Sequence, residues 1–488
     1  MGAGRKNITG LITAIVFIAV LLGLSCKHEP GVAPGVDGGY PGEVADIFMN
    51  RCATSGCHNA LSYTAAGGLL LDSWEHLFDG GNNGAVVVAY SSEFSSLMYF
   101  INTDSTLGPI AIPTMPLNHN PLTKEEYLAI KKWIDEGAPD KDGNIPFATE
   151  ADSRQKVYAI HQGCDEIAVI DAAKNVVMRY VSIGSKPFPE SAIYTCVSPD
   201  GRYAYACFWF GNQVYKIDTY TDKVAATYAL NNNFWSTMTI SADGQHLALT
   251  NGDNYNLAII NTVSGQVEYI STVFVNPHGI AANTAFDTFY VTSLNGNTLY
   301  KYNEGYTRVI SVDGGPATTI KGNGTPDPFE IIMSPGGSRY FISCAGSNEV
   351  RVFGTSTDSL LKVIPVGTTP QGMAVAEGKP YLFVTCMEDE AAGIFKGSVY
   401  VINYNTLDVV TVIRGSMYQP HTVAVNERDN TFYIFSRNQN YDGPAPHHSG
   451  PCSGRNGYYQ VYDLNTLGLK NGRRYEVLVD PYVSAIRF

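Results

Sequence analysis

The sequence predicts a multidomain chain: a small all-α domain followed by an all-β propeller of seven blades. A unit of roughly 40 to 60 residues recurs from position 156 to position 488, and repeats of this length are typical of propeller blades. The chain contains 48 Gly and 31 Tyr but only 16% charged residues, a composition that favours strands and tight turns. A helical pattern near residues 122–139 precedes the repeats. The propeller is therefore expected to begin after a separate helical part.

Residues 1–26 have the pattern of a signal peptide. Arg5 and Lys6 precede an apolar run over 11–24 that ends at a small residue before Cys26. This arrangement is typical of an export signal, and the run is short for a membrane span. Residues 27–40 carry Pro and Gly without periodicity, so we expect a tether there. Export implies an oxidising compartment that permits disulfides.

The end of this segment, Leu22-Gly23-Leu24-Ser25-Cys26, resembles a bacterial lipoprotein box. The resemblance implies that Cys26 is lipidated and that the protein is anchored in the cell envelope, in the periplasm or at the outer membrane. Gly23 departs from the usual box. A plain cleaved signal or an uncleaved anchor remains the alternative.

The sharpest motif of the chain lies at residues 52–58. Cys52 and Cys57 are separated by four residues, and His58 follows directly. Two thiols that can add to haem vinyl groups, followed by a histidine for the iron, indicate c-type haem attachment. The usual spacing has two residues between the cysteines. A zinc site would need two further ligands nearby, which the sequence does not provide, and a Cys52–Cys57 disulfide is the other alternative.

A sixth iron ligand is expected from residues 113–116. Met115 lies there between two prolines, far along the chain from His58. A thioether opposite a histidine raises the reduction potential and suits electron transfer. Met115 is the predicted distal ligand, and His119 is the competing candidate.

Residues 122–139 should form the helix that closes this part. Thr123 is the expected N-cap, with Glu126 in the capping-box position. Leu128, Trp133 and Ile134 provide the expected apolar face, and Gly137 with Pro139 ends the helix.

Residues 41–145 as a whole resemble small bacterial c-type cytochromes found in multidomain exported proteins. The matching stretches are 57–58, 67–72, 77–81, 114–116 and 122–139. The resemblance implies one covalent haem c, attached at Cys52 and Cys57, with His58 as the proximal ligand and Met115 as the distal ligand. It also implies a redox partner protein.

A polar linker at 146–155 leads into the repeats. The inner strands of the successive repeats are expected to start at a similar turn in each: near Ala192, Trp235, Pro277, Pro328, Pro370, Pro420 and Pro481. The first repeat lacks an inner strand, and the last has room for only one strand. The two chain ends should therefore complete one blade together, which leaves no open sheet edge.

Several blade segments, such as 198–201, 214–221 and 399–406, resemble the YVTN-type propeller family. The resemblance spans residues 156–488. It implies the fold and leaves the function open, because propellers support many activities.

One face of the predicted disc collects unusual residues. A turn before each inner strand should place one residue per blade around the channel mouth: Ile193, Ser236, His278, Phe329, Gln371, His421 and Tyr482. His278 and His421 should lie near opposite one another and could bind a metal, haem or substrate. His161, His447 and His448 map to loops of the same face, although each is also compatible with a structural role.

Six cysteines map to the propeller: Cys164, Cys196, Cys207, Cys344, Cys386 and Cys452. Disulfides are expected among them, but their pairing cannot be deduced from the sequence.

The net charge of −13 argues against nucleic acid or an anionic membrane surface as a partner. Three functions remain: an electron-transfer protein whose propeller docks a redox partner, an oxidoreductase with a second cofactor or substrate at the channel mouth, and a surface binding protein with an accessory haem. The layout resembles haem c/haem d nitrite reductases, although those have eight blades. Whether a second metal or chromophore is present separates the oxidoreductase from the other two.

Overall fold

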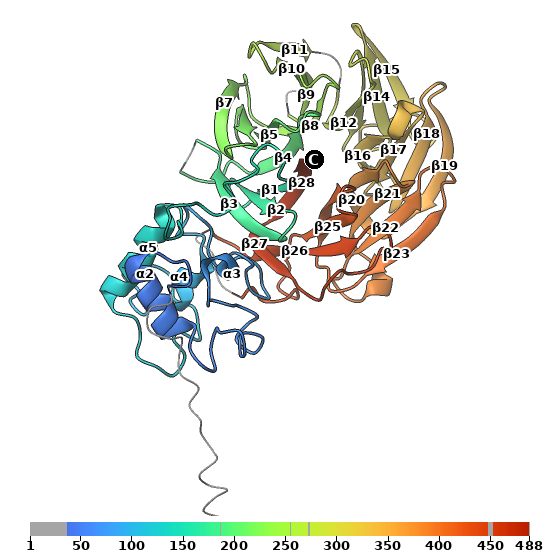
Figure 1. Cartoon of the computed structure of the whole chain (residues 1–488). Coiled ribbons are helices and arrows are strands. Elements are labelled where there is room, and N and C mark those ends of the chain that lie inside the picture. The colour runs from blue at the N-terminus through green and yellow to red at the C-terminus, as the bar shows by residue number, and fades with distance from the viewer. Residues whose placement is uncertain (1–36, 186, 254, 272–273, 448–451, 488) are drawn as a thin grey trace, which may run out of the picture.

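The computed structural model describes residues 37–488 except 186, 254, 272–273, 448–451 and 488 (Figure 1). The predicted export signal with Cys26, most of the predicted tether, and His448 lie outside the described residues. Among the described residues, no helix is long and apolar enough to cross a membrane.

The chain is mostly β, and its strands form the predicted seven-bladed propeller (Figure 1). Every blade is a four-stranded antiparallel sheet. Blade 1 contains β28 (Pro481–Arg487), β1 (Lys156–His161), β2 (Glu166–Asp171) and β3 (Val176–Ser182). Blade 2 contains β4 (Ala192–Val197), β5 (Tyr203–Phe208), β6 (Gln213–Asp218) and β7 (Lys223–Ala229). Blade 3 contains β8 (Trp235–Ile240), β9 (His246–Asn251), β10 (Asn256–Asn261) and β11 (Val267–Ser271).

Blade 4 contains β12 (Pro277–Ala282), β13 (Thr288–Ser293), β14 (Thr298–Asn303) and β15 (Tyr306–Ser311). Blade 5 contains β16 (Pro328–Met333), β17 (Arg339–Cys344), β18 (Glu349–Gly354) and β19 (Ser359–Pro365). Blade 6 contains β20 (Thr368–Ala376), β21 (Tyr381–Glu388), β22 (Ser398–Asn403) and β23 (Val409–Arg414). Blade 7 contains β24 (Pro420–Asn426), β25 (Thr431–Ser436), β26 (Asn456–Asp463) and β27 (Tyr475–Val479).

Each pair of neighbouring blades encloses its own hydrophobic cluster. The second strands are buried on both faces, and all six residues of β1 and of β25 are buried. Such strands read as continuous apolar runs because neither face meets water. The repeated unit therefore buries its surface only against the next unit, as expected for a propeller.

The two ends of the chain complete blade 1, as predicted. β28 pairs antiparallel with β1, so that Arg487 lies opposite Lys156. The Arg487 side chain is 2% exposed and donates to the backbone carbonyls of Gly201, Ala151, Arg154 and Asp152. The ring closure is thus fixed by a guanidinium that reaches from the last strand into the segment before the first.

The residues predicted to surround the channel mouth were expected in turns before the inner strands. The structure places them inside those strands instead. Every inner strand shifts register near its start, so that an extra residue bulges out there. A bulge bends the strand and redirects a side chain. His278 and Phe329 are therefore held by the sheet itself, as the second residues of β12 and β16.

The helical part comprises α2 (Gly42–Ile47), the π-helix η1 (Phe48–Cys52), α3 (Trp74–Leu77), α4 (Ser96–Phe100) and α5 (Lys124–Asp135). These helices share one hydrophobic cluster, which also contains residues of the intervening loops. Two short 3₁₀-helices, η2 (Pro335–Gly337) and η3 (Glu390–Ala392), lie in propeller loops.

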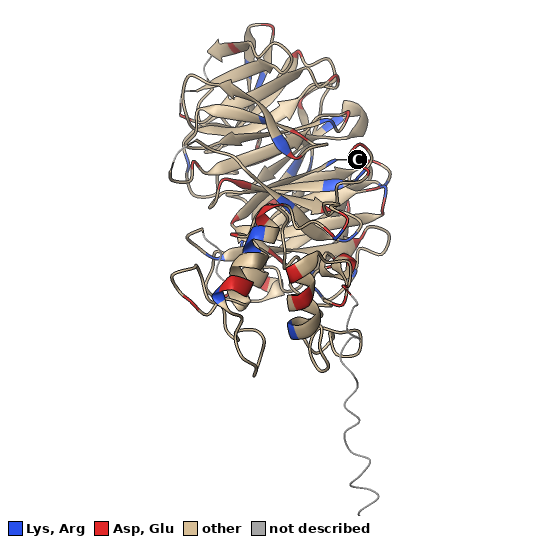
Figure 2. Ribbon diagram, turned by 60° about the vertical axis from the view of Figure 1, so that its left-hand side comes forward, with Lys and Arg blue, Asp and Glu red and all other residues tan. Residues whose placement is uncertain are grey.

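Helix α5 has the predicted capping box, with Thr123 and Glu126 bonded reciprocally. Its apolar face was predicted only in part. Trp133 and Ile134 are buried, but Leu128 is 42% exposed. At 100° per residue, Leu128 lies on the side opposite the buried Ile130 and Ile134. That outer side carries charges of both signs (Figure 2), including the Lys131–Asp135 pair.

The helical part lies against the outer strands of blades 1 and 7, near β3 and β27 (Figure 1). Val88 joins the hydrophobic cluster between these two blades. The ring of Phe94 packs 5.1 Å from that of Tyr180 on β3, and Lys174 forms an ion pair with Asp79. The two parts are thus joined by apolar and charged contacts at the rim of the disc.

Candidate functional site

A cavity of about 550 Å³ lies between the helical part and the rim of the propeller. Cys52, Cys57, His58 and Met115 all line it. Most of the other lining side chains are apolar, including Leu69, Leu71, Val86, Leu97, Phe100 and Ile101 from the helical part and Val177, Val477 and Leu478 from the propeller. Four residues singled out from two distant sequence motifs therefore share one space.

The cysteine motif starts on the π-helix and continues in tight turns. Cys52 is the last residue of η1, and the His58 amide donates to the Cys52 carbonyl at 3.1 Å. Both Cys52 and Cys57 are free thiols, so the disulfide between them that was considered from the sequence is not formed. Burial raises the pKa of Cys52 to about 12, which keeps this thiol protonated.

The imidazole of His58 is oriented by one hydrogen bond. Its Nδ1 lies 3.0 Å from the Leu69 carbonyl oxygen, which can only accept, so Nδ1 is the donor. Burial lowers the pKa of His58 and favours the neutral ring. In this tautomer Nε2 carries a free electron pair, which is the state that a metal-binding histidine requires.

Met115 is held on the cavity wall by its backbone. The Met115 amide donates to the Phe100 carbonyl at 2.7 Å. His119, the competing candidate, is exposed and does not line the cavity.

Arg51 connects the two halves of the site. It donates to the Glu126 carboxylate at 2.7 Å and to the Asn120 carbonyl at 2.8 Å, and so joins the cysteine motif to the loop and helix that follow Met115. This role of Arg51 was not predicted from the sequence, although a basic side chain directly before Cys52 was a visible signal.

The donors present suit a covalently attached haem. Free thiols five positions apart could each form a thioether to a haem, and a neutral imidazole and a thioether could each bind its iron. The cavity has the size range of cofactor sites and largely apolar walls. The residues therefore fit the group that the sequence motif implies.

The propeller forms one side of this cavity through Tyr180, His447 and strand β27. The imidazole ring of His447 lies 4.9 Å from the ring of Phe100. His447 lies in the predicted loop between β25 and β26, where it contacts the helical part at the rim of the propeller. A disulfide between Cys164 and Cys452 ties that loop to blade 1.

His161 is the last residue of β1. It is completely buried behind the cavity wall, with its ring 6.1 Å from that of Tyr180. Its Nδ1 lies 3.2 Å from the Glu166 carbonyl oxygen, and burial lowers its pKa to about 4. This environment makes His161 a neutral packing residue of blade 1.

His278 and His421 do lie at the channel, and both pack around Phe329. The ring of His278 lies 4.2 Å and that of His421 6.5 Å from the Phe329 ring. The two Nδ1 atoms contact backbone carbonyls of Phe329 and Tyr482, at 2.9 and 2.6 Å. Burial lowers the pKa of both, that of His278 to about 4. Both histidines are therefore neutral members of an aromatic layer.

In the part of the chain that the structure describes, no group of three or more His, Cys, Asp or Glu side chains could hold a metal ion. Cys207, Cys344 and Cys386 are buried free thiols, and Cys196 is half-buried. The pair Cys344–Cys386, which ends equivalent strands of adjacent blades, is not bonded.

Comparisons with known proteins show fold similarity only. No family model matches this chain, and no curated protein matches it. A functionally unknown protein from Desulfotomaculum acetoxidans DSM 771 is 14% identical and covers 67% of this chain and 99% of its own length, with a TM-score of 0.49. The hydrazine synthase of Kuenenia stuttgartiensis is 15% identical and covers 62% and 91%, with a TM-score of 0.48. Similarity at this level carries no argument about function.

Proposed function

We propose that this protein is an exported c-type cytochrome with one covalent haem, which transfers electrons, and that its propeller is a docking or recognition module. The observation that carries this proposal is that Cys52, Cys57, His58 and Met115 line the same cavity, whose other walls are largely apolar. A haem held there would supply a one-electron Fe(III)/Fe(II) couple.

The residues of this chain divide the work as follows. Cys52 and Cys57 would each form a thioether to the haem and fix its position. His58 would bind the iron through Nε2, while its Nδ1–H keeps the ring oriented on the Leu69 carbonyl. Met115 would supply a second protein ligand to the iron, and the apolar walls would limit the access of water, which tunes the reduction potential.

The proposal includes the location and the partner. Lipidation of Cys26 would anchor the protein in the cell envelope, on the periplasmic side of a membrane or at the outer membrane. The redox partner is expected to present a basic surface, because a net charge of −13 attracts positively charged proteins and speeds their association.

Spectroscopy and metal analysis of the full chain test this proposal. The protein is produced in a host that contains the c-type haem maturation machinery, and iron and the reduced pyridine spectrum are measured. One iron per chain, all as haem c and lost when Cys52 and Cys57 are both replaced by Ala, is expected. A protein without covalent haem would refute the proposal, and an additional metal or chromophore would support the oxidoreductase alternative instead.

The distal ligand is tested separately with carbon monoxide. We expect the ferrous wild type to bind carbon monoxide poorly, and Met115→Ala to bind it fully, because the sixth position opens. Met387→Ala, at a half-buried methionine of β21, is the matched control and should behave as the wild type. Full binding of carbon monoxide by the wild type would rule out Met115 as the ligand.

A further inference from the structure

Aromatic side chains pack together around the axis of the propeller. Phe329 packs between His278 and His421, and the ring of His421 lies 3.8 Å from that of Tyr482. Arg437 covers the Tyr482 ring at 4.9 Å. The four rings come from β12, β16, β24 and β28, so strands from four different blades contribute to this aromatic layer, and Arg437 directly follows β25.

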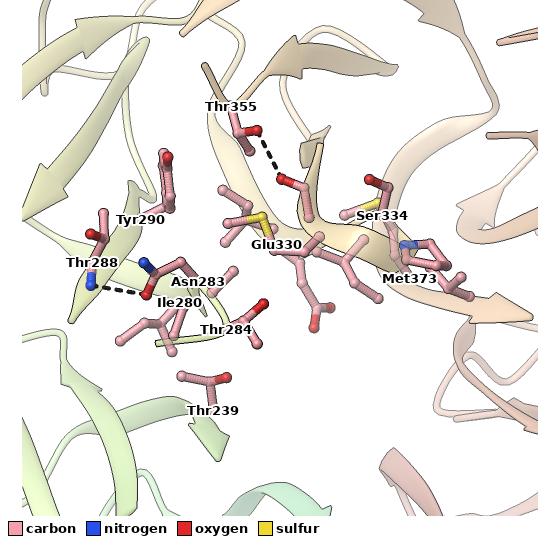
Figure 3. Close-up of a pocket in the computed structure, with 18 of the residues that line it drawn as sticks. Thr239, Ile280, Asn283, Thr284, Thr288, Tyr290, Glu330, Ser334, Thr355 and Met373 are labelled. Atoms are coloured by element: carbon pink, nitrogen blue, oxygen red, sulfur yellow. Dashed lines mark hydrogen bonds between the residues drawn. The ribbon is translucent and has the colours of Figure 1, made fainter. Parts of the chain in front are cut away.

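Next to this layer begins a second cavity, of about 840 Å³. It extends along β12 and β16 to the turns at the other face, and Tyr194, Ile280, Glu330, Ile332 and Met373 are among its lining residues. In Figure 3 the Glu330 side chain extends from β16 into the open space, with Thr239, Ile280 and Thr284 to one side and Met373 to the other. The wall of this cavity therefore carries a carboxyl group beside the aromatic layer.

The β16 bulge explains the position of Glu330. Pro328 pairs with Cys344 and Ile331 with Ile342, so Phe329 and Glu330 together oppose only Ser343. In a regular strand, consecutive side chains point to opposite faces, whereas a bulge lets two neighbours share one side. Phe329 thus contributes to the aromatic layer while Glu330 faces the cavity.

Glu330 has a neutral hydrogen-bond partner but no cationic one. The Tyr194 hydroxyl lies 3.3 Å from Oε1. Among the described residues no Lys, Arg or His forms an ion pair with Glu330, and Lys301, which also lines the cavity, pairs with Asp358 at 2.9 Å. Burial raises the pKa of Glu330 to about 7. Near neutral pH, the carboxylate therefore lacks a counter-charge.

We propose that this cavity binds a small organic ammonium ion, with its charged nitrogen at Glu330 and its apolar part against Ile280, Ile332 and Met373. An ammonium group supplies both the counter-charge and the hydrogen-bond donors that an isolated carboxylate favours. A second carboxylate, Glu377, lines the same cavity and is exposed. A bare metal ion fits less well, because it would need several further ligands converging with Glu330.

Titration calorimetry on the full, haem-loaded chain tests this inference with three probes of similar shape. Benzylammonium should bind, whereas neutral benzyl alcohol and anionic benzoate should bind at least about ten-fold more weakly. Glu330→Gln should weaken benzylammonium binding by about ten-fold or more. Glu268→Gln, on the exposed outer strand β11, is the matched control and should leave binding unchanged.

The pH dependence provides a readout that a merely structural role of Glu330 would not affect. Benzylammonium binds the ionised carboxylate, so its affinity should fall about ten-fold between pH 8 and pH 6, as Glu330 takes up a proton. Tyr194 lines the cavity and Tyr482 lies in the adjoining aromatic layer, but burial raises the pKa of both, that of Tyr482 to about 12, so neither titrates in this range. Tyr290, Lys301 and the exposed Glu377 are the other titratable side chains that line the cavity. Glu330→Gln should abolish the pH dependence.

Two results would overturn the inference. Benzylammonium could fail to bind a protein that is folded by circular dichroism, or benzyl alcohol could bind equally well with no effect of Glu330→Gln. If Glu330→Gln does not fold, Tyr194→Phe with the pH series replaces it, and a pH-independent affinity would then count against the inference. None of these results depends on the haem, so they are distinct from a failure of the proposed function.

Discussion

Neighbouring blades of the propeller enclose clusters of side chains that are mostly inaccessible to water, whereas the helical part forms most of the wall of a cavity of about 550 Å³ that the propeller completes. Four of the five helical elements in the helical part have six residues or fewer, too short to be stable alone in water. The propeller closes on itself through β28 and β1. From this difference we infer that the propeller folds without help from the helical part, and we expect a group bound in the cavity to stabilise the helical part.

Replacement of Cys52 and Cys57 should have the largest effect on the difference in stability between the helical part and the propeller. In the Cys52→Ala/Cys57→Ala double variant, covalent haem should be lost completely, and the helical part should lose amide protection because its cavity stays unfilled. The propeller strands should keep their protection in the same hydrogen-exchange experiment. Cys196→Ala, at a half-buried free thiol of the propeller, is the control. Unchanged protection of residues 42–135 in the double variant would contradict the expected stabilisation.

Arg487→Ala should destabilise the propeller by about 3 kcal/mol, because it leaves buried carbonyls of the closing segment without their donor. The measurement is the urea midpoint of the full chain followed by far-UV circular dichroism. Arg473→Ala, in the turn before β27, is the matched control. A shift no larger than that of the control would mean that strand pairing alone closes the ring.

Glu166 should produce a smaller, pH-dependent effect at the junction of the two parts. This carboxyl is 6% exposed, and burial raises its pKa from 4.5 to about 7, although the Ser182 hydroxyl donates to it. The folded state thus binds the proton more tightly than the unfolded state. The stability that this proton contributes is complete below pH 4.5 and is lost as the pH rises to about 7.

Glu166→Gln imitates the protonated form and should therefore stabilise the protein at pH 8 by about 2 kcal/mol, with little effect at pH 4.5. Urea unfolding at both pH values measures this difference, and Glu268→Gln serves as the exposed control. A variant that is less stable than the wild type at pH 8 would show that the ionised carboxylate has a favourable partner.

The fold of the propeller was readable from the sequence because each repeat must bury its surface against the next one. The spacing of the repeats therefore predicted both the number of blades and the shared blade of the two chain ends. The prediction that Leu128 belongs to the buried face was wrong, and the helical period already excludes it, because at 100° per residue Leu128 lies on the side opposite Ile134. Tyr127 and Ile130, rather than Leu128, complete the buried face.

The site was predictable where local motifs determine it and not where the tertiary fold does. The cysteine motif singled out three lining residues of the cavity, and the proline-flanked methionine a fourth. The position of His447 depends on how a long insertion folds, and Cys164 pairs with a cysteine that is distant in the sequence. Glu330 had a visible signal, an acidic residue inside an inner strand that is otherwise mostly apolar, but its place in the channel follows from a bulge that the sequence does not show.

The disulfide between Cys164 and Cys452 has a mechanical consequence. It closes a covalent loop that contains every strand from β2 to β25. A force that pulls on the two ends of the chain would therefore travel along the backbone as far as Cys164, cross the sulfur bridge and continue from Cys452 to the C-terminus. Such a load would strip β1, β26, β27 and β28 from their neighbours, while β2 to β25 would stay joined as a loop that carries no tension.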